Sequence, residues 1–351
     1  MQGLNQPRVL KAQYWCPHCN NALYKWKHTK TMTIYKCPND KCPEYLKNKE
    51  KLNPLEKLMQ TVKSSQYKLR YQYRDYHFTD KQLAHSKPDE QPEDRIFNIR
   101  RSLNDLCLAL TFHISLGISA RKTAYILEHV FQKPASYQTI LNYARYAATF
   151  CHRFNINFKE HTDTQQVGDE TYIKIKGKNG YVFFFVSPTN RAITAYHIDD
   201  SRDTLPATIA MNEALRTAPE DIPLEFITDG NPSYQAGLHY LNKSRKQDAQ
   251  ISNVKVIGLQ NLDSVSKEYR PFKQIVERLN RTYKFHVKAA NGFNSKNGAV
   301  VLTTLFVTYY NFIRPHMSLR YKPPNTMPGI DEAPTIQDKW ALVLLKAFEL
   351  I

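Results

Sequence analysis

The feature that most constrains the fold is a series of strand-like segments at residues 165–200, followed by helical and strand-like segments in alternation. The first segments show apolar alternation or continuous apolar runs. Asn179-Gly180 between two of them is the dipeptide most typical of a two-residue hairpin turn. The order predicts an α/β domain with three antiparallel strands first. We expect strands at 172–176, 181–186, 192–198, 224–228 and 254–257, and helices at 204–216 and 273–284.

Three acidic residues stand in this framework where packing does not require them. Asp169 lies at the first strand, Asp229 follows the fourth, and Glu277 lies inside the basic helix. The element order is that of a ribonuclease H-like mixed sheet, and open α/β sheets bind ligands at the carboxyl ends of their strands. Carboxylates suit Mg²⁺ or Mn²⁺, and two such ions can hold the attacking and leaving oxygens of a phosphoryl transfer. We therefore expect an enzyme that cuts and joins nucleic acid.

Four of the six cysteines form two close pairs near the N-terminus, Cys16 with Cys19 and Cys37 with Cys42. Pairs with this spacing predict a tetrahedral site for structural Zn²⁺. The alternating residues between the pairs predict two short strands, so residues 1–50 are expected to form a zinc ribbon whose folding depends on the metal.

Positive charge is concentrated toward the N-terminus. The formal net charge is +17, and residues 1–75 hold 15 Lys or Arg against 5 Asp or Glu. Clustered positive charge favours nucleic-acid binding because contacts with phosphate release counterions. We expect residues 51–96 to form a basic arm and linker, with the segment from 46 to 74 following DNA. Four side chains between the zinc ligands either contact DNA or cover the small core: Tyr24, Lys25, Trp26 and Lys27.

Residues 97–152 are predicted as three helices arranged as a helix-turn-helix domain. Gly117 ends the first helix, Ser119 caps the second, and Ser136 caps the third after Pro134. In a helix-turn-helix the last helix enters the major groove. A plain three-helix packing unit is the alternative, and the basic chain favours DNA binding. The expected outward-facing DNA readers are Tyr137, Gln138, Asn142 and Arg145.

The composition argues against a membrane protein and a disulfide-rich secreted protein. No apolar run approaches the roughly 18 residues of a membrane helix, and the N-terminus lacks the apolar stretch of a secretory signal. Cys107 and Cys151 stand alone in apolar, helix-like sequence and are expected to be buried small hydrophobes. This cysteine pattern fits a reducing cytoplasm.

The C-terminal half carries four motifs in order: Asp-Glu-Thr-Tyr-Ile-Lys at 169–174, Thr-Asp-Gly at 228–230, Val-Glu-Arg-Leu-Asn-Arg-Thr-Tyr-Lys at 276–284, and Tyr-Asn-Phe-Ile-Arg-Pro-His at 310–316. Together they resemble the DDE transposase and retroviral-integrase superfamily, above all bacterial insertion-sequence transposases of the IS6-like and related groups. The resemblance implies a ribonuclease H-like catalytic domain at 160–330, followed by a C-terminal helix at 331–351. It implies a catalytic, Mg²⁺-binding triad of Asp169, Asp229 and Glu277.

Some assignments near these motifs stay open. The gap of 48 residues between Asp229 and Glu277 is longer than in compact members, so Asp263 and Glu268 are reserve candidates. Glu170 is expected to be exposed. The residues His197, Asp199, Asp200 and Asp203 are interpreted as a strand end and a solvated loop rather than a metal cluster. Arg278, Arg281 and Lys284 are expected to hold phosphates, and His316 beside Arg314 either contacts DNA or packs.

The function implied by the resemblance is that of a transposase, which binds the ends of its own element, cleaves the strands and joins them to target DNA. Two DNA ends must be handled together, so we expect a homodimer or a higher oligomer working at the bacterial nucleoid in the cytoplasm. The alternatives are a domesticated DNA-binding protein, a metal-dependent nuclease that does not join strands, and a zinc-dependent transcription regulator. The last would leave the triad unexplained.

Overall fold

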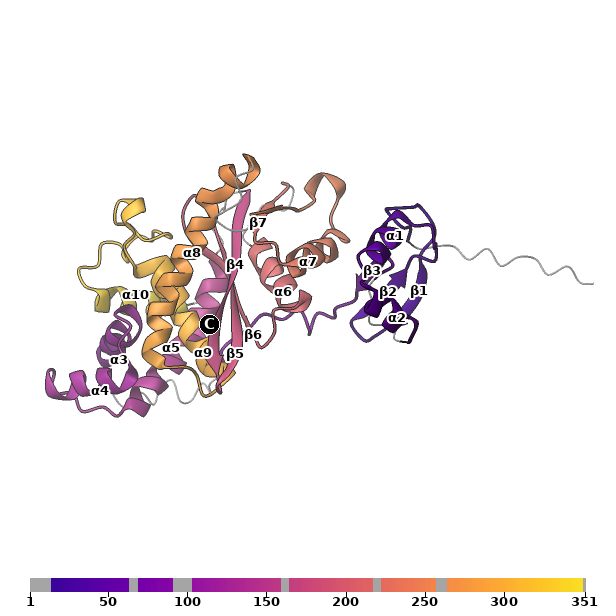
Figure 1. Cartoon of the computed structure of the whole chain (residues 1–351). Coiled ribbons are helices and arrows are strands. Elements are labelled where there is room, and N and C mark those ends of the chain that lie inside the picture. Colours follow the sequence, from indigo (N-terminus) through magenta and orange to yellow (C-terminus); the bar gives the residue numbers. More distant parts are fainter. Residues whose placement is uncertain are drawn as a thin grey trace, which may run out of the picture. The chain divides into compact units, whose positions relative to one another are not determined.

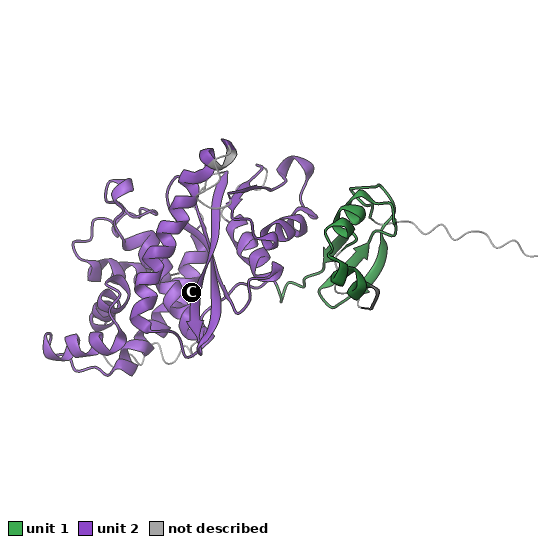
Figure 2. Cartoon of the chain, viewed as in Figure 1, with its two compact units in different colours: residues 1–82 green, residues 83–351 purple. Residues whose placement is uncertain are grey.

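The computed structural model describes residues 14–62, 69–90, 103–158, 164–216, 222–256 and 264–349. The chain divides into two compact units, residues 1–82 and residues 83–351 (Figure 2). Several predicted features lie outside the described residues. They are the end of the expected linker at 91–96, the start of the expected helical domain at 97–102, the strand residue Ile257 and the reserve candidate Asp263.

The first unit contains a three-stranded antiparallel sheet. β1 (Tyr24–His28) pairs with β2 (Met32–Lys36), which confirms the two predicted strands, and β2 also pairs with β3 (Gln72–Tyr76). Between β2 and β3 the chain forms α1 (Pro43–Glu50) and α2 (Pro54–Val62). In its described residues, the stretch expected to be a basic arm is therefore largely folded, and whether it follows DNA stays a prediction. The reason it folds lies in its tyrosines, since Tyr71 and Tyr73 pack against the cysteine cluster.

The second unit contains the helical region and the mixed sheet (Figure 1). Its main elements, in chain order, are α3 (Leu103–Leu110), α4 (Ala120–His129), α5 (Tyr137–Asn157), β4 (Gln165–Ile175), β5 (Lys178–Val186), β6 (Ile193–Asp199), α6 (Thr204–Leu215), β7 (Glu225–Thr228), α7 (Pro232–Asn242), β8 (Ser252–Lys255), α8 (Ser264–Ala290), α9 (Lys296–Thr308) and α10 (Ile336–Phe348).

The helix caps predicted from the sequence are confirmed. The side chain of Ser119 accepts a hydrogen bond from the backbone of α4, and that of Ser136 does the same for α5. Gly117, with φ of +64°, ends the helical stretch that begins with α3. Cys107 and Cys151 are fully buried, as expected. Among the helices of the described residues, none is long and apolar enough to cross a membrane.

The five-stranded sheet has the order β6-β5-β4-β7-β8. β4, β5 and β6 are antiparallel, whereas β7 pairs in parallel with both β4 and β8. Residues of α8 and α9 share a hydrophobic core with one face of the sheet, and residues of α6 and α7 share a second core with the other face (Figure 1). The predicted ribonuclease H-like mixed sheet is thus confirmed.

The predicted hairpin turn at Asn179-Gly180 was wrong. β4 and β5 are joined at Lys176 and Gly177, which have φ of +50° and +76°, and Ile175 pairs with Lys178. A two-residue turn of this kind needs positive φ at both positions, which glycine adopts without strain. Gly180 lies inside β5, where it pairs with Ile173 and the end of the Ile175 side chain lies against it. The true register pairs Asp169 with Phe184 and so sets the direction of the acidic side chain.

Candidate active site

Parallel pairing brings Asp169 and Asp229 together. Val167 of β4 pairs with Ile227 of β7, and each aspartate lies two residues further along its own strand direction. Because side chains alternate along a strand, both aspartates share the sheet face of Val167 and Ile227, which is packed by α8. Within the described residues, oxygens of Asp169, Glu170 and Asp229 all lie within 4.8 Å of one another. Close carboxylates of this kind suit a divalent cation with hard oxygen ligands.

Asp169 is held by two side chains of α8. Lys273 Nζ donates to Asp169 Oδ1 at 2.8 Å, and Asn280 Nδ2 donates to Asp169 Oδ2 at 2.9 Å. Burial raises the pKa of Asp169, the adjacent Lys273 ammonium opposes that rise, and the carboxylates of Glu170 and Asp229 add to it. A bound cation would favour the ionised form. The carbonyl oxygen Oδ1 of Asn280 is buried without a hydrogen-bond partner in the described structure, so the site offers one further oxygen acceptor next to Asp169.

Glu170 is buried, so the expectation of an exposed side chain was wrong. Only 6% of its side chain is exposed. Oε2 accepts a hydrogen bond from the hydroxyl of Tyr234 at 2.6 Å, and Oε1 accepts one from Asn231 at 3.0 Å. Arg202 forms an ion pair with Oε1 at 2.7 Å. Glu170 faces the other side of the sheet from Asp169, where α7 can reach it. Burial and the nearby carboxylate of Glu170 raise the pKa of Tyr234 well above its ordinary value.

Asn231 links the second aspartate to Glu170. Its backbone N–H donates to Asp229 Oδ1 at 2.9 Å, while its side-chain amide donates to Glu170. The side-chain oxygen of Asn231 also accepts from the backbone N–H of Ser233 and caps α7. Sequence reasoning missed this residue, although Asn231 followed by Pro232 is a typical start of a helix. The consequence is that the start of α7 fixes the position of Asp229.

Glu277 lies on α8 between the two side chains that hold Asp169. Lys273 is four residues before it and Asn280 three residues after it, and such positions share one helix face. Glu277 is half-buried, and it does not belong to the acidic group defined above for the described residues. Its role as a ligand stays a prediction. The reserve candidate Glu268 is exposed near the start of the same helix.

The predicted phosphate-binding residues Arg278, Arg281 and Lys284 are all exposed on α8. The Lys284 ammonium lies 4.4 Å from the ring centroid of Tyr172, which is itself exposed. Both groups are thereby held on the surface near the end of β4. Contact of these three cations with DNA stays a prediction.

His316 is buried and packs against neighbouring side chains, which was the second of the two alternatives given above. Its ring meets that of Tyr310 edge-on with centroids 4.5 Å apart. Burial and the adjacent guanidinium of Arg314 together lower the pKa of His316 to about 4, so the ring is neutral at pH 7. Arg314 also lies over the ring of Tyr310. A DNA contact by Arg314 or His316 stays a prediction.

The four expected DNA readers of the helical region are exposed on α5: Tyr137, Gln138, Asn142 and Arg145. Gln138 Nε2 donates to Asn142 Oδ1 at 3.1 Å, which joins two of them on one helix face. Their outward orientation is as predicted. Whether they read DNA stays a prediction.

The four N-terminal cysteines form one cluster. Their sulfurs lie within 4.8 Å of one another, with Cys16 and Cys42 3.9 Å apart and Cys19 and Cys37 3.4 Å apart. Tetrahedral Zn²⁺ with Zn–S bonds of about 2.3 Å places its sulfurs about 3.8 Å apart. The cluster therefore fits a closed structural zinc site. Asp199, at the end of β6, and Asp203, just before α6, do not form a comparable metal-binding group in the described residues.

Buried His197 departs from the solvated interpretation given to its neighbours. It is 4% exposed, and the backbone N–H and hydroxyl of Ser86 both lie 3.1 Å from its Nδ1. The hydroxyl of Ser86 also donates to the backbone oxygen of Ile198. His197 therefore anchors the segment around Ser86 to β6, which is a structural role.

Comparison with known proteins agrees with this arrangement. Residues 164–296 match a protein-family model described as a DDE domain. Comparison with curated proteins gives no match. Among solved structures, one similar to this chain is the HTLV-2 integrase catalytic core domain in complex with magnesium (trimeric form), with 13% sequence identity. The alignment covers 48% of this chain and 97% of that chain, with a TM-score of 0.31. A simian T-cell lymphotropic virus intasome in complex with a PP2A regulatory subunit is 17% identical, with coverage of 59% and 73% and a TM-score of 0.33. At these TM-scores the two structural similarities are too weak to support a conclusion about this protein.

Proposed function

We propose that the protein is an insertion-sequence transposase of the DDE type, because residues 164–296 match a family model described as a DDE domain. It binds the ends of its element, cleaves the DNA strands there and transfers them into target DNA. One observation carries this proposal: Asp169 in β4 lies next to Asp229, which directly follows β7. Glu277 lies on α8, the helix that covers both.

The proposed metal ligands are Asp169, Asp229 and Glu277, with Mg²⁺ or Mn²⁺ as the cation. Bound divalent ions would lower the pKa of an attacking water or DNA hydroxyl and stabilise the leaving oxygen. Asp169 is half-buried between the two donors of α8, which fix the direction of both its oxygens. Asp229 is oriented by the N–H of Asn231. Glu170 has donors at both oxygens, so we assign it to positioning α7 and not to metal binding.

The cations of α8 supply the DNA-binding part of the proposal. Arg278, Arg281 and Lys284 stand in the turns of α8 that follow Glu277 and are exposed. A scissile phosphate beside the acidic group would then have guanidinium and ammonium groups within reach, and these bind phosphate oxygens strongly. The two DNA partners are the element's ends and the target, so the working form is a homodimer or a higher oligomer at the bacterial nucleoid.

The test is a Mg²⁺-dependent cleavage and strand-transfer assay on DNA from the gene's own flanks, with Asp229→Asn as the key variant. The substitution keeps the shape of the side chain and removes one anionic ligand. We expect loss of cleaved and joined products with DNA affinity nearly unchanged. The matched control is Asp248→Asn, which makes the same charge change at an exposed residue and should keep activity.

The outcomes separate the alternatives. Joined products from the wild type and the control, but not from Asp229→Asn, support a transposase. Cutting without joining would identify a nuclease, and specific DNA binding without any reaction would identify a domesticated binding protein. If Asp229→Asn lost DNA affinity in proportion to its lost activity, the ligand assignment of Asp229 would be wrong.

A further inference from the structure

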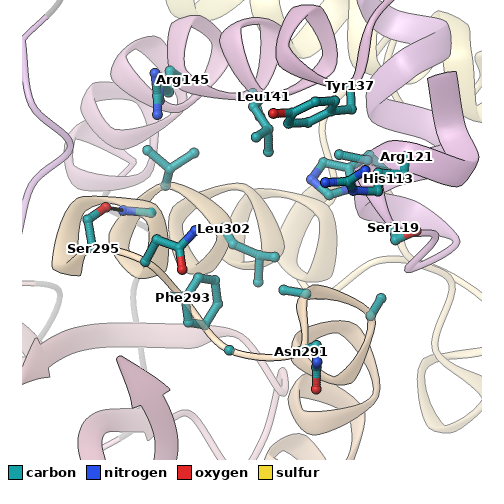
Figure 3. Close-up of a pocket in the computed structure, with 18 of the residues that line it drawn as sticks. His113, Ser119, Arg121, Tyr137, Leu141, Arg145, Asn291, Phe293, Ser295 and Leu302 are labelled. Atoms are coloured by element: carbon teal, nitrogen blue, oxygen red, sulfur yellow. Dashed lines mark hydrogen bonds between the residues drawn. The ribbon is translucent and has the colours of Figure 1, made fainter. Parts of the chain in front are cut away.

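A cavity of about 600 Å³ lies between the helical region and the catalytic domain of the second unit (Figure 3). Its walls come from the starts of α4 and α5, the end of α8, the α8–α9 connection and the first turns of α9. None of the three acidic residues of the candidate active site lines it. The volume falls within the range of about 300–1,000 Å³ that is usual for small-ligand pockets.

The cavity has an apolar floor and a cationic mouth. Phe293 and Leu302 are nearly buried and form part of the floor, and Leu141 of α5 points toward α9 above them (Figure 3). At the mouth stand the exposed side chains of Arg121 and Arg145. All residues that line the cavity belong to the described structure, and among them none is acidic. An apolar floor with uncompensated positive charge at its rim matches an amphiphilic anion.

Tyr137 gives the mouth an aromatic face. Its side chain is 44% exposed, and the guanidinium of Arg121 lies 4.7 Å from its ring centroid. Figure 3 shows the two residues side by side at one end of the cavity. The arginine restrains the ring, so less side-chain freedom is lost when a planar group stacks on it. Exposed aromatic rings beside cations are the platforms on which proteins stack unpaired bases.

We propose that this cavity binds one unstacked nucleotide of the DNA on which the protein acts. The base enters over Tyr137 toward the apolar floor, and Arg145 binds the phosphate that follows it. A base inside a duplex is enclosed by its neighbours, so only an extruded or unpaired nucleotide can place its base in a cavity. The inference rests on the proposed function, because it takes DNA as the substrate, and it adds a second, non-catalytic DNA site between the two halves of the unit.

The experiment compares two fluorescently labelled duplexes of the same arbitrary sequence, one fully paired and one with a single extra adenine that is replaced by 2-aminopurine. Binding to the full-length, zinc-containing protein is followed by anisotropy without added Mg²⁺, so that no strand is cut. We expect the bulged duplex to bind about tenfold more tightly. This factor corresponds to the lower end of the binding free energy expected from stacking one base and contacting one phosphate. The 2-aminopurine emission should change on binding, because the base enters a new environment.

Matched variants assign the effect to the cavity. Tyr137→Ala should abolish the preference for the bulged duplex, whereas Tyr137→Phe, which keeps the ring, should retain it. Arg145→Ala should weaken bulged-duplex binding by about tenfold through loss of a charge-assisted phosphate contact. Its control is Arg153→Ala, which removes an exposed arginine two turns further along α5 that does not line the cavity, and which should keep the preference.

The results distinguish this inference from the proposed function. Equal binding of both duplexes by the wild type, or a preference that survives Tyr137→Ala, would overturn the nucleotide site while leaving the transposase proposal intact. Absence of binding to either duplex would also overturn the nucleotide site, and the cleavage and strand-transfer assay on the gene's own flanks decides the transposase proposal separately. Loss of the preference in Arg153→Ala as well as in Arg145→Ala would show that general surface charge, and not the cavity, sets the affinity.

Discussion

Replacing Glu170 by alanine tests the most unexpected contact network of the site. The side chain is 6% exposed and Tyr234 is fully buried, so truncation leaves the Tyr234 hydroxyl without its acceptor in the protein interior. An orphaned buried group of this kind costs about 1–3 kcal/mol. Arg202 is half exposed, and its ion pair contributes at most about 1 kcal/mol. The sum predicts a loss of about 1–4 kcal/mol in the free energy of unfolding.

The assay is differential scanning calorimetry of the full-length protein. For a domain of this size, a loss of this order lowers Tm by about 2–16 °C. Arg202→Ala serves as the control and should lower Tm by only about 1–3 °C. Tyr234→Phe placed in the Glu170→Ala background removes the orphaned hydroxyl and should restore part of the stability. A Tm for Glu170→Ala within 1 °C of wild type, or no recovery in the double variant, would refute the reasoning.

Three further predictions follow from other parts of the molecule. Cys37→Ser should remove the bound zinc and unfold the first unit, since the metal supplies much of the folding free energy of so small a core; unchanged zinc content by metal analysis would disprove the site. Gly168→Ala would bring a Cβ to 2.3 Å from the ring of Phe185 and should destabilise the protein by about 1–3 kcal/mol; a calorimetric Tm equal to that of wild type would show that β4 accommodates the methyl group. Raising salt from about 50 to 200 mM should weaken DNA binding by orders of magnitude if many phosphates are contacted, and a flat anisotropy titration series would exclude the basic surface from binding.

Local chemistry explains why several elements could be predicted. Ser119 and Ser136 cap their helices through bonds that span only three residues, so the sequence around each is sufficient. The two close cysteine pairs could likewise be recognised locally, because the distance between the two sulfurs of a pair is set by one tight turn. The strands around Asp169 and before Asp229 were found because apolar alternation and continuous apolar runs reflect which face is buried.

The errors arose where distant residues decide the outcome. Asn179-Gly180 has the local features of a turn, but Asn179 and Gly180 pair with Lys174 and Ile173 inside the β4–β5 ladder, and the turn forms at Lys176 and Gly177. Glu170 was expected at the surface, because nothing near it in sequence indicates a buried partner. Its partner Tyr234 is 64 residues away. Within the described residues of the stretch expected to be a basic arm, β3 pairs with β2 across an insertion of two helices, and no local pattern indicated that pairing.

The sequence by itself predicted the two cysteine pairs, the strands of the mixed sheet, and the positions of Asp169 and Asp229, because spacing and periodicity act over a few residues. Only the tertiary structure decided which groups surround those carboxylates. Lys273 and Asn280 reach Asp169 from 104 and 111 residues away, and the cavity beside Tyr137 exists only where α5 meets α9. The physical reason is that burial and side-chain contact are properties of the packed chain, and a linear pattern does not specify which distant faces will meet.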